Sequence, residues 1–354
     1  MHSLDDPLNF GRLDPDGLGD RIRALPAQCH EAWRQAQSFC FPPEFVEIDS
    51  VLVLGMGGSA IAGDIVRSLA LPRSTKTVTV YRGYDLPPSV GERTLVVACS
   101  FSGETEETLS SFSQALSGPS KKLVITTGGR LLATARANGV PSYVFRYAGE
   151  PRSALGHSLM PLLALSTAAG VLPDTSGDVD EAIGLMEELR RANGDTVPLD
   201  ENAAKQLATR LMGKLPVIFA AEALTEAAHR WKTQLNENSK VWAFYGEIAE
   251  LNHNAVEGFG LPREIADRAH VVFLSHPKLN SRNLLRYSGT RDLLEAGDVS
   301  SESVEARGDS DLARVLTAIY FGDWVSYYLA MLNGVRPSPM PAIDQMKRRL
   351  ADAK

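Results

Sequence analysis

A single carboxylate stands between two asparagines in the stretch QLNENSK, residues 234–240. Glu237 lies where a helical pattern over residues 222–235 ends. The negative end of a helix dipole disfavours a second negative charge, which favours the proton affinity that a general base needs. Such a group can remove a weakly acidic proton and return it, which is general acid–base chemistry. Asn236 and Asn238 could orient it without neutralising it. Taken alone, the stretch could also be a solvated helix end.

Two loops rich in glycine and hydroxyl groups could bind an anion. Residues 55–60, GMGGSA, follow one apolar run, and residues 100–105, SFSGET, follow another. Each loop opens a helical segment, where glycine permits close backbone approach and free N–H groups attract negative charge. Because the carboxyl ends of parallel strands meet at one edge of a sheet, we expect both loops to face one ligand. The alternatives are a turn that merely needs glycine and hydroxyls that merely cap helices.

The first loop is also compatible with a dinucleotide. Gly55, Gly57 and Ala60 match the G-x-G-x-x-G/A spacing, which together with Arg82 suggests an NADP-dependent dehydrogenase. A nicotinamide cofactor would also call for an acidic residue at the end of the second strand, where the sequence has YRG at 81–83. The hydroxyls of the second loop suit a phosphate monoester, so a phosphosugar is the preferred ligand.

The order of apolar and helical segments predicts an α/β protein with mainly parallel sheets flanked by helices. A helix over residues 17–39 precedes a first set of predicted strands at 51–54, 77–81, 94–99, 123–126 and 142–145. Beyond a polar stretch near residue 175, further strands are predicted at 216–220, 269–274 and 303–306. Strands separated by helical segments are typical of doubly wound sheets. We predict two domains, residues 1–175 and 176–354, the second ending in a tail that contains Lys347.

Composition and charge favour some partners and exclude others. The 354 residues are 44% hydrophobic and 22% charged, as in ordinary globular proteins, and the formal charge is −7. An acidic balance argues against nucleic acid and anionic membrane surfaces as partners. The mostly apolar run at 159–172 is shorter than the roughly 20 residues of a membrane span.

Cysteine and histidine usage adds two expectations. Cys29, Cys40 and Cys99 form no CxxC pair, which favours a reducing compartment and a cytoplasmic location. The histidines show no metal-ligand spacing, so we expect no metal.

Five motifs, in order along the chain, resemble those of the bifunctional phosphoglucose/phosphomannose isomerase family. They are GMGGS at 55–59, SFSGET at 100–105, NEN at 236–238, NHN at 252–254 followed by Glu257 and Gly258, and Ile343–Asp344 with Lys347. The resemblance runs from about residue 20 to the C-terminus. It implies two sugar-isomerase (SIS) domains and an enzyme that interconverts glucose 6-phosphate and fructose 6-phosphate. Mannose 6-phosphate would be a second aldose substrate.

The resemblance also implies roles for individual residues. Glu237 would move a proton between C2 and C1, Arg152 would stabilise the enediolate, and His253 and Lys347 would help to open the sugar ring. The residues that would hold the substrate phosphate are Gly57, Gly58, Ser59, Ser100, Ser102 and Thr105. Family membership implies a homodimer in which His253 reaches into the partner's site. This mechanism requires no cofactor and no metal.

Two residues depart from the family pattern. Glu104 occupies a loop position where asparagine is frequent, and a carboxylate there would repel a bound phosphate unless it points away. Met340 stands where the bifunctional enzymes carry a threonine associated with the mannose epimer. A second hypothesis is a phosphosugar sensor that binds without turnover, although a sensor would not need Glu237, His253 and Lys347.

Overall fold

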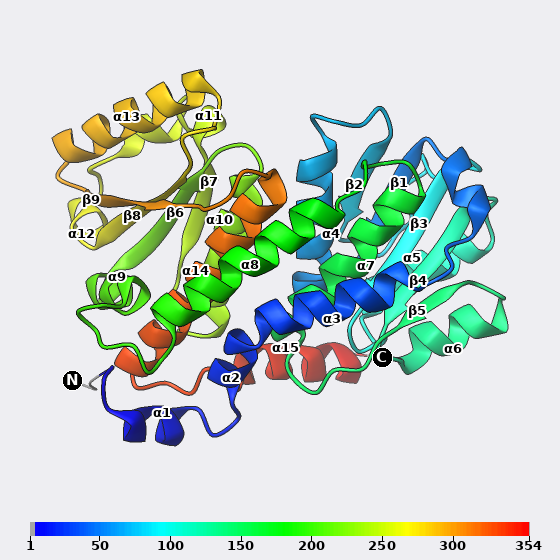
Figure 1. Ribbon diagram of the computed structural model, residues 1–354, viewed down its shortest axis with the longest axis horizontal. Coiled ribbons are helices and arrows are strands. Elements are labelled where there is room, and N and C mark those ends of the chain that lie inside the picture. The colour runs from blue at the N-terminus through cyan, green and yellow to red at the C-terminus, as the bar shows by residue number, and fades with distance from the viewer. Residues whose placement is uncertain (1–3, 354) are drawn as a thin grey trace.

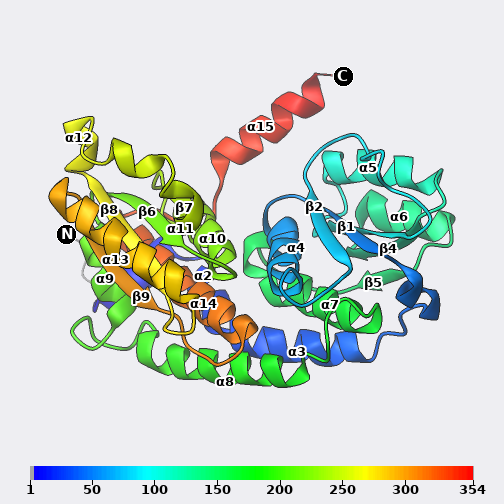
Figure 2. The ribbon, with the colours of Figure 1, turned by 90° about the horizontal axis from the view of Figure 1, so that it is seen from above.

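Two parallel β-sheets form the framework of the computed structural model, which describes residues 4–353. Figures 1 and 2 show the sheets in separate lobes, with helices α3 (Leu25–Gln37) and α8 (Ser176–Asn193) laid along one side of the molecule. The predicted α/β class, with two mainly parallel sheets flanked by helices, is confirmed. The predicted domain boundary at residue 175 falls directly before α8.

The first sheet contains the five strands predicted for it. Its order is β2-β1-β3-β4-β5, and every neighbouring pair is parallel. Parallel strands covered on both faces read as continuous apolar runs, and β3 is buried along its whole length. The strands are β1 (Ser50–Leu54), β2 (Thr77–Tyr81), β3 (Thr94–Ser100), β4 (Lys121–Thr126) and β5 (Ser142–Val144).

Helices cover both faces of this sheet. Val51 and Val53 belong to the large core cluster that contains Ile65 of α4, whereas Leu52 joins Phe112 of α5 in a second cluster. Alternate residues of one strand thus pack on opposite layers. The helices are α4 (Gly57–Ala70), α5 (Glu106–Leu116), α6 (Gly129–Ala137) and α7 (Leu155–Ala168).

The helix predicted over residues 17–39 is two helices. α2 (Leu18–Arg23) and α3 are separated at Ala24, and a further helix, α1 (Pro7–Leu13), precedes them. Pro26 lies in the first turn of α3. Proline has no backbone N–H and fits best in the first turn of a helix, so a continuous helix through this position is disfavoured.

The second sheet repeats the order of the first. Its strands are parallel and ordered β7-β6-β8-β9, so in both sheets the first strand lies between the second and the third. β7 was not predicted because it is a short, largely exposed edge strand that includes Gly246. The strands are β6 (Leu215–Ala220), β7 (Phe244–Glu247), β8 (Ala269–Ser275) and β9 (Ser300–Glu305).

Helix α14 (Asp311–Leu332) is the central helix of the second lobe. It is long and apolar enough to cross a membrane by length and composition, but 94% of its apolar window is buried inside the protein. This helix is longer than the mostly apolar run at 159–172. The other helices that follow α8 in this lobe are α9 (Ala203–Leu211), α10 (Leu224–Glu237), α11 (Ile248–Leu251), α12 (Arg263–Ala266) and α13 (Ser281–Ala296).

Close packing fixes α10 on α14. Nε1 of Trp231 donates a hydrogen bond to the carbonyl of Ala318 over 2.8 Å. A Cβ atom added at Gly322 would lie 2.2 Å from Trp231 Nε1, so only glycine permits this approach. The position of α10, and therefore of Glu237 at its last residue, is set by these contacts.

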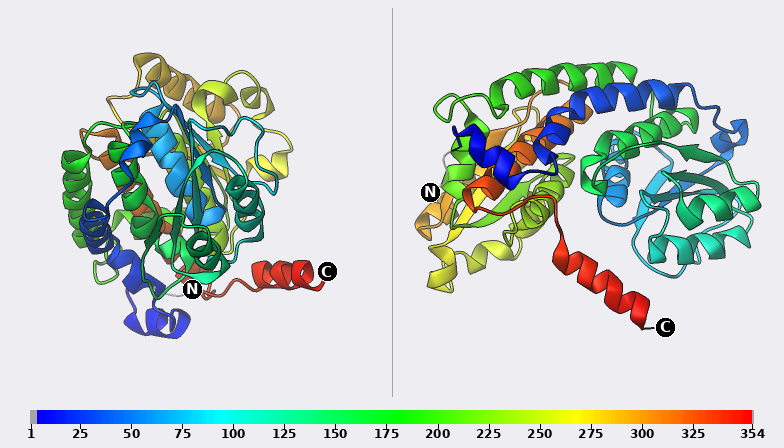
Figure 3. Two further views of the ribbon diagram at one scale, coloured as in Figure 1. Left: turned by 90° about the vertical axis from the view of Figure 1, so that its right-hand side faces the viewer. Right: turned by 90° about the horizontal axis from the view of Figure 1, so that it is seen from below.

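The last helix, α15 (Pro341–Asp352), has no buried residue. Figures 2 and 3 show it projecting away from both lobes. It contains Lys347 and was predicted only as a tail. Three short 3-10 helices complete the described chain: η1 (Pro43–Glu47), η2 (Pro151–Ser153) and η3 (Ala255–Gly258).

Candidate active site

The two glycine- and hydroxyl-rich loops lie side by side at the carboxyl edge of the first sheet. They follow β1 and β3, which are neighbours at the point where the strand order reverses, the usual ligand position in open α/β sheets. The backbone N–H of Phe101 donates to Oγ of Ser59 over 3.2 Å, which joins the loops. Oγ of Ser100 lies 2.9 Å from Oγ1 of Thr105. Oγ of Ser102 accepts from the backbone N–H of Glu104 over 3.2 Å.

The carboxylate of Glu104 turns out of the second loop. It accepts from the backbone N–H of Arg130 over 2.7 Å and from Nε of Arg130 over 2.6 Å. These hydrogen bonds lower the pKa of Glu104 below its ordinary value. The negative charge of Glu104 is therefore paired with Arg130 at the start of α6. The carboxylate points away from the loop, so the repulsion of a bound phosphate that its presence suggested is avoided.

The first loop packs against the turn that bears Arg152. A Cβ atom at Gly58 would lie 3.0 Å from the carbonyl oxygen of Pro151, and the backbone of Gly57 has a φ of +49°. Glycine at these positions thus allows α4 to begin directly against η2. The loop and Arg152, which are far apart in the sequence, form one wall.

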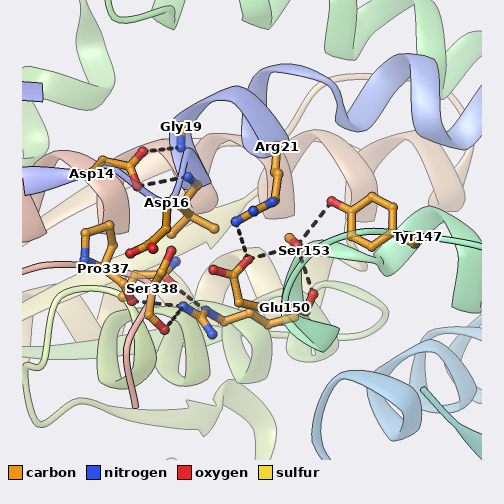
Figure 4. Close-up of polar contacts among 12 residues, drawn as sticks. Asp14, Asp16, Gly19, Arg21, Tyr147, Glu150, Ser153, Pro337 and Ser338 are labelled. Carbon is orange, nitrogen blue, oxygen red and sulfur yellow. Dashed lines mark hydrogen bonds and ion pairs between the residues drawn. The ribbon is translucent and has the colours of Figure 1, made fainter. Parts of the chain in front are cut away.

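Side chains of α2 and of the loop after β5, together with Ser153 of the turn itself, hold the η2 turn in place (Figure 4). Arg21 of α2 pairs with Glu150 over 2.7 Å. Oγ of Ser153 donates to the carbonyl of Glu150 over 2.8 Å, and the hydroxyl of Tyr147 lies 3.2 Å from that Oγ. These contacts fix the backbone on both sides of Arg152.

Arg152 is 3% exposed, and its guanidinium contacts the second lobe and the segment that leads to α15. Nε donates to Oδ1 of Asn238 over 2.7 Å, and Nη2 donates to the carbonyls of Pro337 and Ser338 over 2.8 and 3.2 Å. Figure 4 includes Pro337 and Ser338. Nη1 lies 3.3 Å from Sδ of Met340. Burial lowers the pKa of Arg152, and the charge of Glu237 opposes that shift.

Glu237 ends α10 and faces the first loop across a small cavity. Its Oε2 lies 3.8 Å from Nη1 of Arg152. The cavity has a volume of about 100 Å³ and is lined by Gly57, Gly58, Ile61, Arg82, Arg152, His229, Arg230, Thr233, Gln234 and Glu237. The structure therefore brings Glu237, Arg152 and the first loop together around one cavity.

Asn236 and Asn238 were expected to orient the carboxylate of Glu237, but their side chains make hydrogen bonds to other groups. Nδ2 of Asn236 donates to the carbonyl of Val241 over 2.8 Å. Asn238 is fully buried, where its Oδ1 accepts from Arg152 and its Nδ2 donates to Oγ of Ser326 over 2.9 Å. They act on the helix end and on Arg152 rather than on the carboxylate.

His253 and Lys347 lie apart from this cavity within one chain. His253 is exposed in the turn after α11, and Lys347 is exposed on α15. Among the residues that the structure describes, neither lines the Glu237 cavity. Their roles in opening the sugar ring therefore stay predictions.

Several cavity residues were missed by the sequence analysis. Arg230, Thr233 and Gln234 share one face of α10 with Glu237, since they precede it by one or two helical turns. That spacing was the available signal. His229 also lines the cavity, and its ring stacks on Tyr245 with centroids 4.8 Å apart.

A charged cluster between the lobes offers the one group in residues 4–353 with a geometry that could hold a metal. Ligand atoms of Asp64, Glu226 and His229 lie within 4.8 Å of one another. Asp64 already pairs with Arg82, and Glu226 pairs with Arg67 over 2.5 Å. Because an arginine balances each carboxylate, a divalent cation there would meet two neighbouring positive charges.

Solved structures share the fold. The C-terminal domain of glucosamine-fructose-6-phosphate aminotransferase from Francisella tularensis superposes with a TM-score of 0.73, covering 92% of this chain and 99% of that one at 14% identity. A glucose-6-phosphate isomerase like protein from Thermus thermophilus gives a TM-score of 0.63, covering 96% and 99% at 21% identity. These similarities support the two-lobed α/β architecture.

Sequence relatives show the family. Residues 200–350 match the bacterial phospho-glucose isomerase C-terminal SIS domain. The bifunctional phosphoglucose/phosphomannose isomerase of Caldicellulosiruptor bescii is 37% identical over 95% of this chain and 99% of its own length. That of Aquifex aeolicus is 35% identical over 85% and 90%. The chain thus belongs to the bifunctional phosphoglucose/phosphomannose isomerase family.

Proposed function

We propose that the protein interconverts glucose 6-phosphate and fructose 6-phosphate through an enediolate, with mannose 6-phosphate as a second aldose. The observation that carries the proposal is the placement of Glu237, 3.8 Å from Arg152, across a cavity from Gly57 and Gly58 of the first loop. A base, a cation and an anion-binding loop around one cavity are the groups that aldose–ketose isomerisation needs.

The phosphate of the sugar binds at the two loops. The N–H groups at the starts of α4 and α5 supply positive dipole ends, and the hydroxyls of Ser59, Ser100, Ser102 and Thr105 add hydrogen bonds. Anchoring the phosphate here leaves the other end of the sugar to extend toward Glu237.

Glu237 then transfers the proton. It removes the proton on C2 while negative charge develops on the C1 carbonyl oxygen, and Arg152 stabilises that charge. The proton of the C2 hydroxyl moves to O1, and Glu237 returns its proton to C1. Substrate and product have the same atoms and electrons, so no external oxidant or reductant takes part.

Ring opening needs groups beyond the cavity of one chain. We assign it to the partner's His253 and to Lys347, in a homodimer whose sites each combine residues of two chains. The exposure of His253 and of the whole of α15 supports this assignment, since both are free to meet a second subunit.

Two further expectations belong to this proposal. The division into domains 1–175 and 176–354 is supported by one complete sheet on each side of residue 175. A cytoplasmic location is supported by Cys29, Cys40 and Cys99, which are all free thiols.

A coupled assay of fructose 6-phosphate formation from each aldose phosphate tests the function. Turnover of glucose 6-phosphate is the expected result. Binding of the sugar phosphate without turnover would instead indicate a sensor, and binding of a nicotinamide cofactor in a titration would favour a dehydrogenase.

A further inference from the structure

Lys240 joins the end of α10 to the segment that leads into α15. Its Nζ donates to the carbonyls of Pro337 and Pro339 over 3.1 and 2.7 Å, and also to the carbonyl of Glu237. An ammonium group has three N–H donors, so these three carbonyls can satisfy all of them. The Glu237 carbonyl belongs to the last residue of α10, where backbone acceptors lack partners within the helix. Lys240 therefore clamps two separate segments to one point.

The position of Lys240 is unfavourable in two ways that its hydrogen bonds must offset. Its backbone has a φ of +58°, in the left-handed region that residues with a Cβ atom seldom adopt. Partial burial and the nearby charge of Arg152 lower the pKa of Lys240. Backbone strain of this kind persists only where the surrounding structure fixes it, and it is frequent at functional sites. These costs indicate that the clamp has a specific role.

The segment that Lys240 holds is stiff. Residues 337–341 read PSPMP, and each proline fixes its own φ. We call residues 337–340 the strap. Prolines at every second position favour an extended, semi-rigid chain. Because Pro341 is the first residue of α15, an anchor on the strap is transmitted to the start of that helix.

Two cations anchor the strap, and the strap in turn places α15. The carbonyl of Pro337 accepts from Lys240 and from Nη2 of Arg152, which also bonds the carbonyl of Ser338. Within residues 4–353, no residue of α15 is buried, so core packing does not hold this helix. Figures 2 and 3 show α15 leaving the body of the protein where the strap ends. The anchored strap therefore sets the position of Lys347.

The position of Glu237 depends much less on Lys240. The helix that bears Glu237 is packed on α14 through Trp231 and Gly322. The next residue, Asn238, is fully buried, and both ends of its amide are hydrogen-bonded. Removal of the Lys240 ammonium should therefore release the strap and leave Glu237 in place.

We propose that Lys240 is a positioning residue that presents α15, and with it Lys347, to the sugar. The inference rests on the proposed isomerase function, in which Lys347 helps to open the sugar ring and Glu237 transfers the proton. Lys240 supports ring opening through the strap and does not contact the substrate. A substrate that has no ring to open should not need it.

The first test compares two substrates in Lys240→Met, which removes the ammonium. Glucose 6-phosphate is mostly a closed ring in solution, whereas 4,5-dideoxyglucose 6-phosphate lacks both hydroxyls with which its aldehyde could close a furanose or pyranose ring. The kcat/KM for glucose 6-phosphate should fall roughly 10- to 100-fold, and that for the open-chain analogue by less than about threefold, because only ring opening loses a correctly placed group. Ketose formation is followed by NMR.

Lys214→Met is the matched control. Nζ of Lys214 also donates to a backbone carbonyl, that of Asp267, over 3.0 Å, and Lys214 lies outside the Glu237 cavity. This variant should turn over both substrates as the wild type does. Equal losses on both substrates in Lys240→Met would show that Lys240 supports Glu237 or the fold as a whole. That result would overturn the inference, as would an unchanged kcat/KM for glucose 6-phosphate.

The second test needs no analogue and asks whether Lys240 acts through Lys347. Lys240→Met is added to Lys347→Ala, and kcat/KM for glucose 6-phosphate is measured for both single variants and the double variant. Because groups that act as a unit are not additive, the second substitution should lower the remaining kcat/KM by less than about threefold. Losses that multiply would overturn the inference.

Pro339→Gly provides the same test if Lys240→Met does not fold. It softens the strap and leaves Lys240 unchanged, so it should lower kcat/KM for glucose 6-phosphate and spare the open-chain analogue. Equal losses on the two substrates would again overturn the inference. A wild-type protein that does not isomerise glucose 6-phosphate would instead remove the proposed function, and this inference with it, so the two failures are distinguishable.

Discussion

Nη1 of Arg152 lies 3.8 Å from Oε2 of Glu237, and this pair connects a turn of the first lobe to the last residue of a helix on the second. Arg152 is 3% exposed and bonded on its other edges, whereas Glu237 keeps 26% of its side chain exposed. The cation is therefore fixed and the carboxylate is accessible to a ligand. That asymmetry suits a rigid electrostatic group beside a proton-transfer group.

Arg152→Lys should lower kcat by about 10²- to 10³-fold, the usual effect of removing a preorganised donor of this kind. A single ammonium cannot span Asn238, Pro337 and Ser338 as the planar guanidinium does. We also expect the free energy of unfolding to fall by about 1–3 kcal/mol, since a buried acceptor is left unpaired. Steady-state kinetics and urea unfolding measure the two effects.

Arg93→Lys is the control for this substitution. Arg93 pairs with Asp49 at an exposed position, outside the Glu237 cavity, so both measurements should stay near their wild-type values. Wild-type kcat in Arg152→Lys would show that the guanidinium does not act on the reaction.

Met340→Thr should raise the ratio of mannose 6-phosphate to glucose 6-phosphate turnover, by roughly tenfold. Sδ of Met340 lies 3.3 Å from Nη1 of Arg152, the nitrogen that also faces Glu237. Threonine shortens the side chain and adds a hydroxyl at this point. The ratio of kcat/KM for the two aldoses is its own control, because a general loss of activity lowers both. An unchanged ratio would remove Met340 as a specificity determinant.

Mixed dimers should reveal whether His253 serves the partner's site. Glu237→Gln and His253→Ala are each expected to be inactive. After the two proteins are unfolded and refolded together, about a quarter of wild-type activity should return, since half the dimers are mixed and each of these has one intact site. A mixture that stays inactive would place His253 in the site of its own chain.

Stability should depend on pH through Glu302, which lies on β9 of the second sheet. Burial alone would raise its pKa, but hydrogen bonds from His270 and Arg210 outweigh burial and lower the pKa to about 2. Because the folded pKa lies below the ordinary value, the stabilisation is present above about pH 4.5 and is lost as pH falls toward 2.

Glu302→Gln should therefore reduce the free energy of unfolding at pH 7 by at most about 3 kcal/mol, with kcat unchanged. The difference from wild type should shrink as pH is lowered below about 4.5 in urea unfolding experiments. A difference of the same size at pH 3 and pH 7 would mean that Glu302 stabilises the fold by other means.

The sheets could be predicted because their strands are continuous apolar runs. β1 and β3 are buried on both faces and carry a clear signal, whereas β7 is a four-residue exposed edge strand with a glycine. The N-terminal helix was predicted as one segment because its apolar spacing continues across Ala24. The helix divides there, and Pro26 in the first turn of α3 disfavours a continuous helix.

The candidate site was only partly predictable. Motif spacing pointed to Glu237 and to both loops, but nothing in the sequence places Gly58 against Pro151 or turns Glu104 toward Arg130. Arg230 and Gln234 showed no motif of their own, and they line the cavity on a helix that is held in place by its packing on α14. Such relations arise from packing between distant segments.

The central claim is that Glu237 transfers the proton, and the rate of fructose 6-phosphate formation from glucose 6-phosphate tests it most directly. Wild type and Glu188→Gln, an exposed glutamate on α8, should convert the aldose at equal rates. Glu237→Gln should lower kcat by about 10²- to 10⁴-fold with unchanged thermal stability. A Glu237→Gln protein that isomerises glucose 6-phosphate at the wild-type rate would contradict the account.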